Sequence, residues 1–233
     1  MISFPNAKIN LGLHIVSKRS DSFHNIETLM IPIAYYDVLE IIKTKDTKFE
    51  LNISGNTEPI NIEDNLCTKA YKLLQKNYGI SGVKVHLHKN IATGAGLGGG
   101  SANAAFTLKI LNEIFKLNLS AQELQNFASQ LGSDCAFFIE NEAAFSSGRG
   151  EVLQKANMNF KDLYVFIIVP EIHISTADAY KNCIVGKHEI SLFELLKNPQ
   201  NKWKSIIEND FEDSVFKIHP ILETIKTQIY EMG

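Results

Sequence analysis

The sequence has few cysteines and no long apolar segment, and each absence excludes a class of protein. Its three cysteines, Cys67, Cys135 and Cys183, are odd in number and far apart. This spacing fits neither a disulfide framework nor a zinc site. The longest apolar run, residues 163–169, is much shorter than the ~20 residues that span a bilayer. These features predict a cytoplasmic protein that does not act on a membrane.

Basic clusters are also missing. The formal net charge is −3, from 23 basic and 26 acidic side chains, and no run of lysine or arginine marks a nucleic-acid-binding face. We therefore expect no nucleic-acid partner, and any phosphate must be bound by a local site. At 233 residues, the chain is long enough for two lobes or for one large domain.

Glycine, in contrast, is concentrated in one stretch. Five of the seven residues from Gly94 to Gly100 are glycine. A strand-like alternation over residues 83–87 precedes this stretch, and apolar residues at helical spacing follow it, which predicts a helix that begins near Ser101. The free N–H groups and the positive dipole end of a helix start favour phosphate. The sequence therefore predicts an anion-binding loop.

Three other interpretations of this loop fit less well. A dinucleotide-binding fold needs a second parallel strand that ends in an acidic residue, but residues 120–123 form a capping box that opens another helix. A nucleotide P-loop needs a lysine before its Ser or Thr, and Gly99-Gly100-Ser101 has none. A flexible linker is not normally placed between a strand and a well-patterned helix.

Several segments resemble motifs of the GHMP small-molecule kinases. Residues 96–105, Gly-Leu-Gly-Gly-Gly-Ser-Ala-Asn-Ala-Ala, resemble the central ATP-binding motif of that family. Residues 5–11 and 133–134 are similar to its first motif and to the segment that carries its catalytic aspartate. The resemblance implies an α+β fold of two lobes with the active site between them.

The same resemblance implies a domain division. Residues 1–154 would form an N-terminal nucleotide-binding domain, and residues 155–233 would form a C-terminal substrate domain. Family members continue into a third glycine-rich motif where this sequence stops at Gly233. We therefore expect the second lobe to be incomplete.

The resemblance also implies roles for individual residues. Lys8 and Asp134 would be catalytic, and Ser101 is a candidate ligand for Mg²⁺. The implied ATP-binding residues are Asn65, Leu66, Ala92, Thr93, Gly94, Ala95, Gly96, Leu97, Gly98, Gly99, Gly100, Ser101 and Ala102. The residue patterns alone leave simpler interpretations open, in which Lys8 is a solvated strand lysine, Asp134 is a helix N-cap and Asn65 belongs to another N-cap.

The implied substrate is a small molecule that carries cytidine diphosphate, used in isoprenoid precursor biosynthesis. Its implied binding residues are Asn10, Phe23, His24, Thr176 and Tyr180, with the cytosine between Phe23 and Tyr180 and with His24 at its polar edge. Phe23 stands where the family has tyrosine, so a hydroxyl contact is lost there. The expected activity is ATP-dependent phosphorylation of a hydroxyl of this substrate. The alternatives are a homoserine-like or mevalonate-like kinase, and a non-catalytic nucleotide-binding protein.

Hydrophobic patterns predict several further elements. In residues 8–15, Ile9, Leu11, Leu13 and Ile15 alternate with polar residues, which indicates a half-buried strand with these four on one face. Further strands are predicted at residues 38–42 and 49–53, and a buried strand at residues 163–169. Apolar spacing from Leu222 to Met232 predicts a final amphipathic helix.

Overall fold

The computed structural model describes residues 1–56, 61–160, 163–170, 172, 174, 179–180 and 183–232. The strands in this part are β1 (Ile2–Ser3), β2 (Asn6–Lys18), β3 (His24–Tyr36), β4 (Val38–Lys43), β5 (Phe49–Gly55), β6 (Val83–Lys89), β7 (Ala144–Ser147) and β8 (Val152–Lys155). They form two four-stranded sheets, with the orders β1-β4-β6-β5 and β2-β3-β7-β8.

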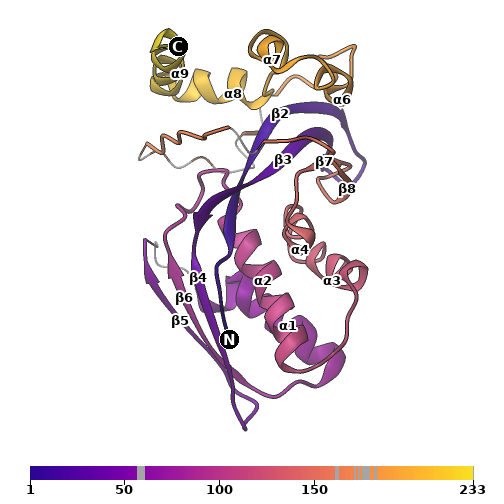
Figure 1. Cartoon of the computed structure of the whole chain (residues 1–233), viewed down its shortest axis with the longest axis vertical. Coiled ribbons are helices and arrows are strands. Elements are labelled where there is room, and N and C mark those ends of the chain that lie inside the picture. The colour runs from indigo at the N-terminus through magenta and orange to yellow at the C-terminus, as the bar shows by residue number, and fades with distance from the viewer. Residues whose placement is uncertain are drawn as a thin grey trace.

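The described helices complete an α+β fold, as predicted. They are the short 3₁₀ helix η1 (Ile62–Asp64) and α1 (Leu66–Tyr78), α2 (Gly99–Ile114), α3 (Ala121–Ala128), α4 (Phe137–Glu140), α6 (Leu192–Leu195), α7 (Gln200–Ile206), α8 (Phe211–Ile218) and α9 (Pro220–Met232). In Figure 1, α1 and α2 lie beside the first sheet, whereas α6 to α9 gather at the far end of the β2–β3 hairpin. None of the described helices has the length and hydropathy needed to cross a membrane.

The first sheet and its helices enclose the main core. Along β6, Val83, Val85 and Leu87 are buried and the residues between them are exposed, which is the expected pattern for a strand with one covered face. The predicted strands at 38–42 and 49–53 are confirmed as β4 and β5. The core cluster joins this sheet to side chains of α1, α2 and α4, so the start of α2 is packed against the sheet by buried side chains.

A bulge in β2 changes which side chains face the site. Gly12 has a φ of +71° and is the extra residue between Leu11 and Leu13, where the register with β3 shifts. Each such shift reverses the faces of the residues that follow. Leu13 and Ile15 therefore lie on the face of Lys8, and the prediction that they share a face with Ile9 and Leu11 is wrong. A period-two pattern contains no signal for an extra residue.

Helix starts follow the local sequence closely. The side chain of Asn65 accepts the Cys67 N–H at 2.8 Å and caps α1. Ser120 and Glu123 form the predicted reciprocal capping box of α3. The start of α2 differs, because its N-cap residue is Gly98, which has a φ of +71° and no side chain that could cap the helix. Its first N–H groups are therefore left for another partner.

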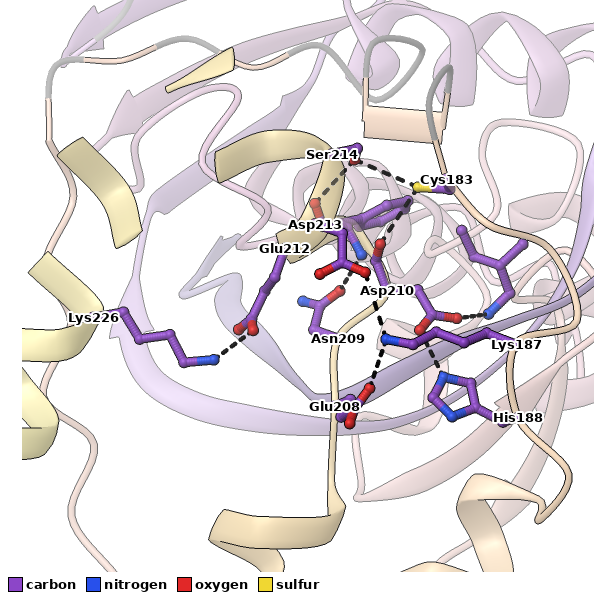
Figure 2. Close-up of polar contacts among 12 residues, drawn as sticks. Cys183, Lys187, His188, Glu208, Asn209, Asp210, Glu212, Asp213, Ser214 and Lys226 are labelled. Carbon is purple, nitrogen blue, oxygen red and sulfur yellow. Dashed lines mark hydrogen bonds and ion pairs between the residues drawn. The ribbon is translucent and has the colours of Figure 1, made fainter. Parts of the chain in front are cut away.

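The C-terminal helices are attached to β2 beside the bulge. The backbone of Leu13 bonds to the Glu208 oxygen at 2.9 Å and to the Asp210 N–H at 2.8 Å. The carboxylate of Asp210 accepts the Ile15 N–H at 2.7 Å and contacts His188 Nε2 at 2.7 Å (Figure 2). Asp210 is 4% exposed, so this buried carboxylate fixes the start of α8 relative to β2.

His188, Glu208 and Asp210 bring three donor atoms within 4.8 Å of one another, as a metal site would. Each of these side chains already has a protein partner. Glu208 pairs with Lys187 at 2.9 Å, and Asp210 is held as described above (Figure 2). We infer that this group is a structural connection rather than a metal site.

Residues 163–169 do not form the predicted strand. Within the described part of the chain no strand pairs with them, and the side chains of Tyr164 and Phe166 are 100% and 82% exposed. An apolar run becomes a strand only when a neighbour takes up its backbone N–H and C=O groups. The apolar composition of residues 163–169 gave no information on whether such a neighbouring strand exists.

Candidate active site

One pocket of about 1100 Å³ contains nearly all the predicted site residues. Its lining includes Lys8, Asn10, Phe23, His24, Asn65, Leu66, Ala92, Thr93, Gly94, Ala95, Gly96, Leu97, Gly98, Gly99, Gly100, Ser101, Asp134 and Tyr180. The volume exceeds the ~300–1,000 Å³ that is usual for a single ligand. Segments that are distant in sequence therefore converge on a space that is large enough for two small molecules.

Two predicted residues are not placed in this pocket. Ala102 is fully buried in the core, and its N–H bonds to the Gly98 oxygen at 2.9 Å, the first hydrogen bond of α2. Ala102 therefore offers neither its side chain nor its N–H group to a ligand in the pocket. Thr176 lies outside the described residues.

Lys8 and Asp134 meet across the pocket. The Nζ of Lys8 lies 3.0 Å from Asp134 Oδ2, and the two side chains are 5% and 30% exposed. Asn10 Oδ1 also accepts from the Lys8 ammonium, and Asn10 Nδ2 donates to Thr28 at 2.9 Å. This chain of contacts fixes the direction of the lysine and leaves one side of the aspartate accessible from the pocket.

The simpler interpretations of these two residues are wrong. Lys8 is 4% exposed as a residue, so it is not a solvated strand lysine. Asp134 does not cap α4, whose N-cap position is Ala136. Asn65 does cap α1, and it lines the pocket as well.

The glycine loop is shaped for close approach to a ligand. Gly94, Gly96 and Gly98 have φ values of +74°, +73° and +71°, which residues with a side chain rarely adopt. A Cβ atom on Gly98 would lie 3.0 Å from the side chain of Lys8. The Lys8 N–H also bonds to the Leu97 oxygen at 2.9 Å, so the loop and the lysine are held together.

A buried charge network below the loop was missed from the sequence. Lys89 pairs with Asp37 and donates to Asn103 Oδ1 at 3.1 Å. Asp37 Oδ1 accepts the N–H groups of Asn90 and Ile91 at 2.8 and 2.9 Å. The network joins the entry of the glycine loop to α2, so we infer that it positions the loop. Asp37 is not part of a recognisable sequence motif, so only its tertiary contacts reveal its role in the network.

Aromatic side chains surround the other end of the pocket. The ring of His24 stacks on Tyr180 with centroids 4.9 Å apart and an angle of 4° between the planes. Phe211 meets Tyr180 edge-on at 4.8 Å, and the guanidinium of Arg149 lies 5.0 Å from the centroid of Phe23. Phe211 and Arg149 are pocket residues that the sequence interpretation did not select.

These aromatic groups favour their neutral forms. Burial lowers the pKa of His24, and the charge of Lys18 lowers it further. Burial, assisted by the charges of Asp134 and Cys183, raises the pKa of Tyr180 to about 12. At neutral pH His24 and Tyr180 therefore offer ring faces and neutral hydrogen-bonding groups, which suit a heterocyclic base.

Comparison with known proteins agrees with this geometry. The family described as GHMP kinases N terminal domain matches residues 65–142. The 4-diphosphocytidyl-2-C-methyl-D-erythritol kinases of Bacteroides thetaiotaomicron and Cytophaga hutchinsonii are 48% and 47% identical to this chain, and each match covers 100% of the chain and 86% of the relative.

A solved structure of 4-(cytidine 5'-diphospho)-2C-methyl-D-erythritol kinase has the same fold. It is 24% identical, with a TM-score of 0.78, and the match covers 100% of this chain and 84% of that one. The resemblance to the GHMP kinases is confirmed by these relatives, whose matches cover the whole chain. The chain belongs to the GHMP kinases and, within them, to the 4-diphosphocytidyl-2-C-methyl-D-erythritol kinase family.

Proposed function

We propose that this protein transfers the γ-phosphoryl group of ATP to a hydroxyl of 4-diphosphocytidyl-2-C-methyl-D-erythritol, in the non-mevalonate route to isoprenoid precursors. The observation that carries the proposal is the Lys8–Asp134 ion pair, which lies in one pocket with the glycine loop and the aromatic group around Tyr180. The names of the relatives support the same substrate.

The glycine loop is the proposed phosphate site. The N–H groups of Gly99, Gly100 and Ser101 precede the first hydrogen bond of α2, and the helix dipole adds about half a positive charge at this end. Glycine at these positions removes the Cβ atoms that would hold a phosphate away. We place the adenosine beside Asn65 and Leu66, which line the pocket next to the loop.

In the proposed reaction, Asp134 orients the acceptor hydroxyl and takes up its proton. Lys8 balances the charge that spreads over the transferred phosphoryl oxygens. Phosphoryl transfer depends mainly on such positioning and charge stabilisation. The contact between Lys8 and Asn10 holds the ammonium in place before substrate binds, so little reorganisation is needed.

Mg²⁺ fits the donor set of the pocket. Ser101 and Asp134, whose side chains carry oxygen donors, both line it, and Mg²⁺ prefers oxygen ligands and substrate phosphates. We propose Ser101 as its protein ligand. When bound, the ion would neutralise charge on the phosphates of ATP.

We propose that the cytosine binds among Phe23, His24 and Tyr180. His24 covers one face of Tyr180, so a base that stacks on this face requires the imidazole to rotate to the edge of the base. Neutral His24 could then hydrogen-bond the cytosine. The roles of Asn10 and Thr176 as substrate contacts, and the division into domains at residues 1–154 and 155–233, belong to the same proposal.

The location of the protein is also proposed. The three cysteines are free thiols, as is usual in the reducing cytoplasm. ATP is supplied in that compartment. We therefore propose a cytoplasmic enzyme.

A coupled assay of ADP release tests the function. The protein is given ATP and Mg²⁺ with the cytidine substrate, with mevalonate or with homoserine, and the Asp134→Asn variant serves as the control. We expect turnover with the cytidine substrate alone. Turnover with mevalonate or homoserine would identify another GHMP kinase, and ATP binding without turnover of any substrate would identify a non-catalytic nucleotide-binding protein.

A further inference from the structure

We propose that Arg149 is the binding site for the diphosphate group that joins the cytidine to the polyol of the substrate. This inference rests on the proposed function and adds a residue that determines substrate specificity. Arg149 comes from the turn between β7 and β8, away from the glycine loop that is proposed for ATP. The two ligands would therefore have separate phosphate sites in one pocket.

The turn holds the arginine in a defined place. Gly148 O accepts the Ile26 N–H at 2.8 Å, and Gly150 O accepts from the Ser146 hydroxyl at 2.8 Å. The residues on both sides of Arg149 are thus fixed to the second sheet. A side chain carried on such a turn can present its head group without a large loss of backbone freedom.

The turn that carries Arg149 lies between the two ends of the proposed substrate. On one side the Arg149 guanidinium covers Phe23, at 5.0 Å from the ring centroid. On the other side, the next residue in the turn is Gly150, where a Cβ atom would lie 3.7 Å from Asp134 Oδ1. A diphosphate that links a base near Phe23 to a hydroxyl near Asp134 must cross the space that Arg149 borders.

Arg149 also has free hydrogen-bond donors. Within the described part of the chain, its side chain pairs only with Glu151, through Nε at 3.5 Å, and the two terminal NH₂ groups have no partner. Among the residues that the structure describes, the other Lys and Arg side chains of the pocket are Lys8 and Lys89, and these are already paired with Asp134 and Asp37. A guanidinium with its outer edge free is suited to bidentate contact with phosphate oxygens.

Calorimetric binding of CDP and of cytidine tests the proposal directly, because these ligands differ only in the diphosphate. We expect Arg149→Ala to weaken CDP binding by about 10–100-fold, the range for loss of charge-assisted hydrogen bonds. Cytidine affinity should change by less than about threefold. The CDP affinity of Arg149→Lys should lie between those of the unmodified protein and Arg149→Ala, since lysine keeps the positive charge but lacks the paired N–H donors of the guanidinium.

Lys155→Ala is the matched control, because it removes one positive charge from the same hairpin at a side chain that is 63% exposed and does not line the pocket. It should leave both affinities unchanged. Thermal unfolding of each variant verifies that the hairpin is intact. In turnover, Arg149→Ala should raise KM for the cytidine substrate and leave KM for ATP unchanged.

Two results would overturn the assignment while the proposed function stands. Equal losses of CDP and cytidine affinity would mean that Arg149 only supports Phe23, and a raised KM for ATP with an intact preference for CDP would assign Arg149 to the nucleotide. If the unmodified protein binds neither CDP nor cytidine, the proposed substrate itself is wrong, and the assignment of Arg149 fails with it.

Discussion

Lys8 Nζ lies 3.0 Å from Asp134 Oδ2, although the two residues belong to the second strand of the chain and to the turn before α4. The surroundings of each side chain keep the two charged groups in contact. Lys8 is buried and directed by Asn10, whereas Asp134 keeps 30% of its side-chain surface exposed. An ion pair with one accessible carboxylate can serve a substrate hydroxyl, which a fully buried pair could not.

Asp134→Asn should lower kcat by about two to four powers of ten with ATP affinity nearly unchanged, because general-base and positioning roles are worth that much in the transition state. Lys8→Ala should behave alike. The double variant should lower kcat by a smaller factor than the product of the two single-variant factors, since the pair acts as a unit. Single-turnover rates and ATP titrations measure these quantities, and strictly additive effects would argue against a working pair.

Gly100 offers a clean test of the phosphate site. It lies in helical geometry at the start of α2, and among the described residues a Cβ atom there would meet only Leu66, at 3.8 Å. Gly100→Leu should therefore keep or slightly raise the melting temperature, because leucine favours a helix by up to about 1 kcal/mol over glycine. It should reduce ATP affinity by at least about tenfold, as measured by calorimetry.

Glu113→Ala, at an exposed position near the other end of α2, is the control for Gly100→Leu and should leave ATP affinity unchanged. Unchanged ATP affinity in Gly100→Leu would show that the ATP phosphates do not bind at this loop. Substitution of Gly98 is less informative, because its positive φ and its proximity to Lys8 would combine backbone strain with displacement of the catalytic lysine.

The aromatic group should determine selectivity for the base. Tyr180→Ala and Phe23→Ala should each raise KM for the cytidine substrate by about 5–100-fold, from a stacking contribution of ~1–3 kcal/mol per base. KM for ATP should not change. Tyr78→Ala, which removes an exposed ring that contacts Phe127, controls for loss of an aromatic side chain. An unchanged KM in both pocket variants would refute the proposed cytosine site.

Stability should fall on the acid side because of His14. Burial lowers the pKa of this residue, and the charge of His188, whose ring stacks on it at 3.5 Å, lowers it further. The charges of Asp210, Glu27 and Glu208 oppose these effects only in part. Below a pH of about 6.5, the ordinary pKa of histidine, the unfolded chain therefore binds more protons than the folded chain does. The free energy of unfolding should therefore decrease as the pH falls.

Denaturant unfolding at pH 7.5 and pH 5 measures this effect as a loss of unfolding free energy at the lower pH. His14→Gln should show a smaller loss between the two pH values than the unmodified protein. His86→Gln, at an exposed position on β6, should show the same loss as the unmodified protein. Equal pH dependence in His14→Gln and the unmodified protein would assign the acid sensitivity to other groups.

Local patterns determined much of this protein from the sequence alone. The glycine loop, the helix after it, the capping box at Ser120 and the alternation of β6 each depend on residues within a few positions of one another. Backbone freedom, capping and period-two burial act over that range. The family resemblance added roles for Lys8 and Asp134 that the local patterns alone did not favour.

Only the tertiary structure decided how distant residues meet. The bulge at Gly12 changes the face of Leu13, and residues 163–169 lack a pairing partner among the described strands. The contact of Lys89 with Asp37 and the placement of Arg149 over Phe23 likewise depend on how sheets and turns pack. Such contacts are determined by register, twist and packing between segments far apart in the chain. The spacing of neighbouring residues does not encode these properties.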